Sequence, residues 1–135
     1  MKLYLDASVL VRLLNDELEL PRVSGEQRLL VSSFAVGEVG SVFSRLVSMG
    51  EMPADAADVW LAEFDLWCEQ ATSIVDTDAA DIRAASRLVR RYPLQTKLPD
   101  TIHLVLAERH SATLVTADRK LAAAARQRDA LVELI

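Results

Sequence analysis

The sequence contains a single cysteine, few glycines and prolines, and few aromatic residues. Among its 135 residues are one Cys, four Gly and four Pro, and 5% are aromatic. One thiol, Cys68, can form neither an internal disulfide nor a multi-cysteine zinc site, which favours a reducing cytoplasm. Because no Pro- or Gly-rich tract or low-complexity linker divides the chain, we expect one domain over residues 1–135.

The chain also lacks a long apolar run and a basic charge balance. No stretch approaches the ~18–20 apolar residues that cross a bilayer, and Asp6 comes too early for a secretory signal. These absences predict a soluble, cytoplasmic protein with no membrane partner. The formal net charge of −5 has the wrong sign for phosphate contacts, although setting aside four acids discussed below leaves −5 + 4 = −1.

Short apolar runs alternate with longer stretches of helical periodicity. Strands are expected at residues 3–5, 29–31, 72–75, 112–115 and 131–134, and helices at 9–14, 34–49, 53–70, 78–91, 99–107 and 118–128. Residues 15–27 are polar and are expected to form a loop or a short helix. The alternation of strand and helix predicts an α/β fold with a mainly parallel sheet.

Four acids stand at corresponding places in this pattern. Asp6 directly follows the first strand, and Asp118 lies just past the fourth. Glu38 stands about one turn into the helix after the second strand, and Asp100 stands in the first turn of the helix before the fourth. Because the carboxyl ends of parallel strands share one edge, we expect all four acids to project toward that edge.

Each acid taken alone has a structural explanation. Asp100 and Asp118 fall in first turns of helices, where carboxylates accept free N–H groups, and Asp6 could cap the next helix. Glu38 could pair with Arg45, two turns further on. Together, however, carboxylates in a partly buried cleft repel one another, so they require protons or a cation. Oxygen ligands without cysteine suit Mg²⁺ or Mn²⁺, which can activate water for phosphodiester chemistry.

The segments around these acids resemble the four motifs of PIN domains. They are Leu5-Asp6-Ala7-Ser8-Val9, Phe34-Ala35-Val36-Gly37-Glu38-Val39, Pro99-Asp100-Thr101-Ile102-His103 and Val115-Thr116-Ala117-Asp118-Arg119. They occur in the family's order, so the resemblance covers essentially the whole chain. By size, the nearest subgroup is the VapC-like toxins of toxin–antitoxin pairs. Pro99 and Thr101, on either side of Asp100, depart from the commoner form of the third motif.

The resemblance implies a fold, an activity and a set of site residues. The fold would be a three-layer αβα sandwich around a five-stranded sheet. The activity would be an Mg²⁺- or Mn²⁺-dependent endoribonuclease that leaves a 5′-phosphate and a 3′-hydroxyl. The implied metal ligands are Asp6, Glu38, Asp100 and Asp118, with Ser8 and Thr116 as hydrogen-bond partners of these ligands. The implied partners are the RNA substrate, a second copy of the chain and a small antitoxin.

Other residues have two interpretations each. The candidates for RNA contact near the expected site are Lys97, Arg119 and Lys120. Arg83, Arg87 and Arg90 share a helix face, which is either a solvated face or a stripe that follows phosphates. Trp60, Phe64 and Trp67 share another, which either packs on the helix at 34–49 or forms a lip for a dimer mate or an antitoxin helix. His103 lies among apolar neighbours, which favours a core position or a role beside a ligand.

Rival enzyme classes fit the sequence less well. A haloacid-dehalogenase-like site requires a second Asp two residues after the first, where Ser8 stands. A response regulator requires paired acids at the first strand, an acceptor Asp after a middle strand and a late lysine. The fit is poor but not absent, because Asp76-Thr77-Asp78 follows the third strand. Dinucleotide binding requires a Gly-rich turn after the first strand, and there is none. The alternative from another class is a catalytically silent PIN scaffold that binds RNA or a protein, and it stays open. No residue indicates the RNA target.

Overall fold

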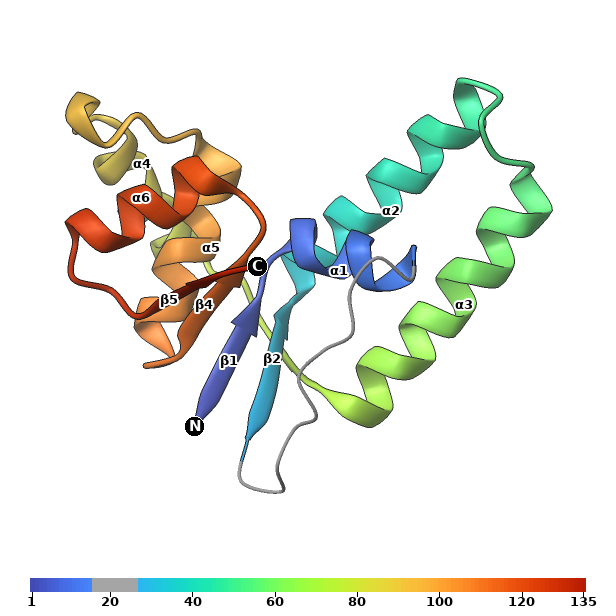
Figure 1. Cartoon of the computed structure of the whole chain (residues 1–135), viewed down its shortest axis with the longest axis horizontal. Coiled ribbons are helices and arrows are strands. Elements are labelled where there is room, and N and C mark those ends of the chain that lie inside the picture. Colours follow the sequence, from blue (N-terminus) through green and yellow to red (C-terminus); the bar gives the residue numbers. More distant parts are fainter. Residues whose placement is uncertain (16–26) are drawn as a thin grey trace.

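The computed structural model describes residues 1–15 and 27–135 (Figure 1). Its five strands are β1 (Lys2–Leu5), β2 (Arg28–Ser32), β3 (Ser73–Val75), β4 (Thr113–Thr116) and β5 (Val132–Leu134). All neighbouring strands pair in parallel, in the order β3-β2-β1-β4-β5. The predicted parallel five-stranded sheet is therefore confirmed. The loop or short helix predicted at 15–27 falls, except for its two end residues, outside the described residues.

Six α-helices connect the strands in the described part of the chain. They are α1 (Ala7–Leu14), α2 (Ser33–Ser48), α3 (Ala54–Ala71), α4 (Ala79–Val89), α5 (Leu98–Arg109) and α6 (Arg119–Gln127). A 3₁₀ turn, η1 (Tyr92–Leu94), follows α4 and is not predicted from the sequence. No helix among the described residues is long and apolar enough to span a membrane.

Two hydrophobic cores lie on opposite faces of the sheet. Successive residues of a strand point to opposite faces. Leu3 and Leu5 therefore pack with α1, α2 and α3 in one core, whereas Tyr4 packs with α4, α5 and α6 in the other. Figure 1 shows the two sets of helices on either side of the strands. The predicted three-layer αβα arrangement is confirmed.

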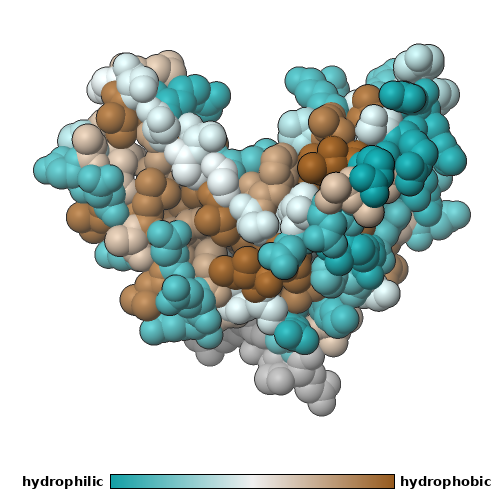
Figure 2. Space-filling model, turned by 180° about the vertical axis from the view of Figure 1, so that it is seen from behind, coloured by the Kyte–Doolittle hydropathy of each residue, from teal (hydrophilic) through white to brown (hydrophobic). Residues whose placement is uncertain are grey.

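The two longest helices, α2 and α3, form a helical hairpin that makes one wall of a hollow. The hairpin turns at Gly50, whose φ of 73° lies in the left-handed region that glycine adopts without strain. The Gly50 N–H donates to the Val47 carbonyl at 3.0 Å, and the Glu51 N–H donates to Leu46 at 2.9 Å, which closes the end of α2. Figure 2 shows the hollow between this hairpin and the opposite side of the molecule.

The order of the strands places a natural ligand site at this hollow. From β1 the chain continues to β2 on one side, while β4 pairs with the other side of β1. In such sheets ligands bind beyond the carboxyl ends of the strands where the winding direction reverses. That point lies between the ends of β1 and β4, and the arrowheads of β1 and β2 point toward the hollow in Figure 1.

Candidate active site

Asp6 stands at the end of β1 and is held from three sides. Its side chain is only 3% exposed. Oδ1 accepts the Ser8 hydroxyl at 2.6 Å and the Val9 N–H at 3.1 Å, and Oδ2 accepts the Thr116 hydroxyl at 2.5 Å. Asp6 therefore caps α1, as its structural explanation predicts, but only one of its oxygens serves the cap. The bonds from Ser8 and Thr116 fix the plane of the carboxylate at the β1–β4 edge.

Asp118 follows β4 and is tied to the same network. Its N–H donates to Thr116 Oγ1 at 3.0 Å, so this one hydroxyl connects Asp118 to Asp6. Asp118 Oδ1 accepts the N–H groups of Lys120 at 2.8 Å and Leu121 at 3.0 Å, which caps α6. The cap again occupies a single oxygen. Within the described residues Oδ2 of Asp118 accepts no hydrogen bond, so it is available to a ligand.

Glu38, near the start of α2, has a partner that the sequence does not indicate. Its Oε1 lies 2.5 Å from His103 Nε2 on α5. The pairing with Arg45 considered from the sequence is therefore wrong. His103 is 2% exposed, and its ring lies against those of Phe34 at 5.4 Å and Tyr4 at 5.7 Å between centroids. The imidazole thus reaches Glu38 from inside the core rather than from solvent.

A buried chain of hydrogen bonds extends from His103 to the start of α2. His103 Nδ1 lies 2.7 Å from the Tyr4 hydroxyl, which in turn hydrogen-bonds to Ser32 Oγ at 2.8 Å. Ser32 Oγ also accepts the Ala35 N–H at 2.9 Å and caps α2. Burial raises the pKa of Tyr4, so its phenol keeps its proton. Sequence reasoning misses this chain because its contacts join residues 28 and 99 positions apart.

Asp100 interacts electrostatically with each of the other three acids. It is half-buried in the first turn of α5, and its carboxylate accepts no hydrogen bond from any described residue. Burial raises the pKa of Asp100, and the negative charge of Asp118 raises it further. Asp6 and Glu38 act in the same direction, while His103 opposes them. Each of the other three acids therefore acts on Asp100, as expected if all four share one edge.

The donor set suits a hard divalent cation. Among residues 1–15 and 27–135, no group of three or more His, Cys, Asp or Glu side chains stands close enough to enclose an ion unaided. Mg²⁺ retains several water molecules and takes only one or two carboxylates directly. The unbonded carboxylate of Asp100 and the free oxygen of Asp118 lie among negative charges that such an ion would neutralise.

A wide cleft adjoins the acids on the α1–α2 side. Its volume is ≈ 710 Å³. Ser8 and Glu38 line it, together with the exposed side chains of Arg12 and Arg45. Neither arginine is a site residue in the sequence prediction. Their positions in the sequence do not indicate that they share a site, because only the packing of α1 on α2 places both on one cleft.

A smaller pocket adjoins the acids on the α5–α6 side. It measures ≈ 100 Å³, and Asp100 and Asp118 form part of its wall. Lys97 and Lys120 line it as well, so the structure brings these two predicted RNA contacts to the acids. Arg119, the third, is exposed and lines neither this pocket nor the α1–α2 cleft.

The sequence as a whole matches one known family. The match is to the PIN domain and covers residues 3–127. The chain belongs to the PIN-domain family. The matched range contains all four acids, so the resemblance of the four motifs is confirmed at the level of the family. No curated protein matches the chain.

Several solved structures share the fold of this chain. VapBC2 from Rickettsia felis, bound to a promoter DNA fragment, has a TM-score of 0.75 at 17% identity and covers 99% of this chain and 98% of that chain. PAE2754 from Pyrobaculum aerophilum has a TM-score of 0.72 at 18% identity, covering 98% and 89%. VapC20 from Mycobacterium tuberculosis, a sarcin–ricin loop cleaving toxin, has a TM-score of 0.65 at 15% identity and covers 90% of this chain and 94% of that chain. Identities this low show a shared fold.

Proposed function

We propose that this PIN domain is a divalent-metal-dependent endoribonuclease, and that it acts as a homodimer and as the toxin of a toxin–antitoxin pair. The environment of Asp100 is the main support for the proposal. Its carboxylate is half-buried, has no hydrogen-bond donor among the described residues, and is influenced electrostatically by three further acids. A buried carboxylate among like charges requires a counter-charge. The fold shared with toxin PIN proteins supports an RNA phosphodiester as the substrate.

The four acids would have different roles at the carboxyl edge of the sheet. Asp6, Asp100 and Asp118 would hold Mg²⁺ or Mn²⁺ directly or through water, and Glu38 would hold a water or a second ion. The bound ion would supply an activated water and neutralise charge on a phosphodiester oxygen. Because hydrogen bonds already fix Asp6 and one oxygen of Asp118, these groups would need little reorganisation during the reaction.

Glu38 would orient the attacking water. Its Oε1 is occupied by His103 Nε2, which leaves Oε2 to accept a proton from a water at the edge. The oxygen of that water would form a bond to phosphorus while the bond from phosphorus to the ribose O3′ breaks. The products would be a 3′-hydroxyl and a 5′-phosphate.

Removal of the metal tests this proposal directly. We expect the protein to cut end-labelled RNA in Mg²⁺ or Mn²⁺, to stop in EDTA, and to recover when excess Mn²⁺ is added, because four unneutralised carboxylates repel the phosphodiester. Gel analysis of the labelled fragments measures the rate. Undiminished cutting in EDTA would contradict the metal mechanism. Metal-dependent RNA binding without cutting on a broad RNA panel would favour the silent scaffold instead.

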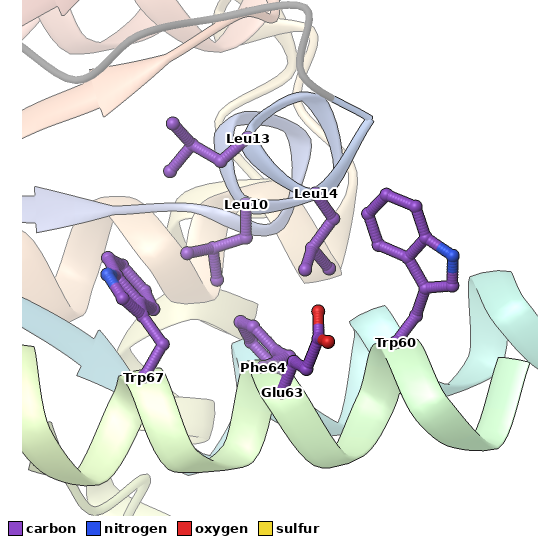
Figure 3. A pocket seen from close by; sticks show the side chains of 7 residues that line it. All are labelled: Leu10, Leu13, Leu14, Trp60, Glu63, Phe64 and Trp67. Atoms are coloured by element: carbon purple, nitrogen blue, oxygen red, sulfur yellow. The ribbon is translucent and has the colours of Figure 1, made fainter.

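An apolar groove between α1 and α3 supports the antitoxin part of the proposal. It measures ≈ 370 Å³ and is lined by Leu10, Leu13, Leu14, Trp60, Glu63, Phe64 and Trp67. Figure 3 shows Leu10 and Leu14 of α1 pointing toward the aromatic side chains of α3. Phe64 is buried in the core, whereas both tryptophans are only partly buried and line the groove. Phe64 therefore packs in the core, and the partly buried tryptophans support a docking role as part of this proposal.

The charge of α3 indicates the chemistry of the occupant. This helix contains no Lys or Arg, and its acids are Asp55, Asp58, Glu63, Asp65 and Glu69. Glu63 is the charged residue in the groove lining. An amphipathic antitoxin helix with an apolar face and a flanking basic residue would bury its apolar side chains here and pair with Glu63.

Tryptophan fluorescence can test this docking, because Trp60 and Trp67 are the two tryptophans of the chain. The proposal requires a short antitoxin protein encoded beside this gene, and adding that protein is expected to shift the emission to shorter wavelength, since binding would exclude water from the groove. The substitution Glu63→Lys should weaken the affinity about tenfold by reversing the charge in the groove. Asp58→Lys, on the exposed face of α3 and outside the lining, is the matched control. Equal weakening by both variants would contradict specific docking at the groove.

A further inference from the structure

Cations line both pockets that adjoin the four acids. Arg12 of α1 and Arg45 of α2 line the ≈ 710 Å³ cleft, which Glu38 also borders. On the other side, Lys97 and Lys120 line the ≈ 100 Å³ pocket. In a chain with a net charge of −5, the acids are thus flanked by two basic positions on each side. This distribution needs an explanation, because acids this close would attract the cations into ion pairs.

The four cations form no ion pair with any described residue. In the part of the chain that the structure describes, the ion pairs join His103 to Glu38, Arg109 to Asp81, and Arg128 to Glu108. No side-chain hydrogen bond there involves the guanidinium or ammonium groups of the four cations either. Their charged ends are therefore available to an anion.

The smaller pocket carries a second sign of a missing ligand. Thr96 lines it, and the Thr96 hydroxyl oxygen is buried without a hydrogen-bond partner. A buried polar atom without a hydrogen-bond partner destabilises the folded chain, and an oxygen-bearing ligand in the pocket would relieve this. Gln95 beside it has a φ of 53°, a left-handed conformation that is strained for a non-glycine residue. A pocket of ≈ 100 Å³ holds on the order of three water molecules. That is room for one phosphate group.

We propose that a single strand of RNA crosses the four carboxylates, with one backbone phosphate in the Arg12–Arg45 cleft and another in the Lys97–Lys120 pocket. The scissile phosphate then lies between them, at the acids. This path rests on the proposed ribonuclease function and adds to it the contacts that hold the substrate on either side of the acids. It also adds Arg12 and Arg45 to the predicted RNA contacts.

The lining of the path determines how RNA binds. No aromatic residue lines either pocket in the described structure, so bases have no stacking platform there. Phosphate charge then dominates the affinity. We therefore expect binding that tolerates sequence changes and weakens steeply with salt.

The test compares matched pairs of charge removals. Fluorescence anisotropy measures the affinity for a labelled, unstructured oligouridylate in Mg²⁺, with Asp6→Asn as the common background so that the RNA is not cut. The first variant pair is Arg12→Gln with Arg45→Gln, and the second is Lys97→Gln with Lys120→Gln. The control pair is Arg83→Gln with Arg87→Gln, which are exposed on α4 and line neither pocket. All three pairs remove the same charge, so a non-specific effect appears in each. All six side chains changed in the three variant pairs are exposed, so the pairs should retain the fold of the Asp6→Asn background, and a thermal melt checks this.

Each path pair is expected to weaken binding about tenfold near physiological salt, whereas the control pair changes it less than about twofold. The slope of log affinity against log salt should fall by about 0.7 for each path pair, because each pair contacts one phosphate of a single strand. In the cleaving protein, each path pair should raise KM and leave kcat nearly unchanged, because these contacts hold the strand on both sides of the reacting phosphate.

Three outcomes overturn the path. The first is a control pair that weakens binding as much as the path pairs do, the second is an effect confined to one pocket, and the third is unchanged binding in both path pairs. Failure of the proposed function gives a different result: RNA binds through both path pairs, but the protein without the Asp6 substitution never cuts it. Metal-dependent cutting with unchanged binding in both path variants would leave the ribonuclease intact and refute the path.

Discussion

Replacing Asp6 with Asn should lower the rate of RNA cleavage by about 10²–10³-fold while leaving the protein folded. Asp6 is the most rigidly held of the four acids, since it accepts bonds from Ser8, Val9 and Thr116. Neutralising it removes a full charge from the proposed metal site, and metal-ion stabilisation of such a transition state is worth several kcal/mol. Multiple-turnover cleavage of labelled RNA in saturating Mn²⁺ measures the effect.

The same substitution preserves the local structure, which makes the result interpretable. Asn retains Oδ1 as the acceptor for Ser8 and for the Val9 N–H that caps α1. Its amide nitrogen stands in place of Oδ2 and can donate to the Thr116 hydroxyl oxygen. Asp78→Asn, at the exposed N-cap of α4, is the matched control and should cleave normally. An Asp6→Asn protein that is folded and cuts at the normal rate would refute the four-acid site.

Two substitutions of His103 are expected to separate its support of Glu38 from its place in the core. A Gln amide can place a donor near Nε2, facing Glu38, whereas an Asn amide reaches only the Nδ1 position, facing Tyr4. A hydrogen bond to a charged group contributes about 1.5–3 kcal/mol. His103→Gln should therefore cleave at least about tenfold faster than His103→Asn, because Glu38 keeps its orientation. Each variant leaves one buried group unpaired and should lose about 1–3 kcal/mol of stability.

Kinetics and unfolding must be measured together for these variants. The informative readouts are kcat, the Mn²⁺ concentration at half-maximal rate, and the free energy of unfolding in urea. Tyr4→Phe provides the control, because it breaks the contacts to His103 and Ser32 without touching Glu38. It should lower stability by about 1–3 kcal/mol and affect kcat less than His103→Asn does. Equal losses of activity in the Gln and Asn variants would mean that His103 serves only packing.

The sequence by itself determined the class of fold and the edge at which the acids meet. Hydrophobic periodicity and the alternation of strand and helix are local properties, and they predicted the parallel sheet correctly. Since every crossover returns the chain in the same direction, an acid just after a strand or at the start of a following helix stands at the carboxyl edge. Asp6 and Asp118 required no further information to be assigned there.

Only the tertiary structure decided which side chains serve those acids. Local reasoning offered Arg45 as the partner of Glu38, whereas the packing of α5 places His103, 65 residues away, against it. The cations of the two pockets likewise come from elements that are distant in the sequence, such as Arg12 on α1 and Lys120 on α6. Periodicity and capping specify each element separately, but the angle and register at which helices cover a sheet arise from the packing of whole side-chain layers. Contacts between elements therefore had to be read from the folded chain.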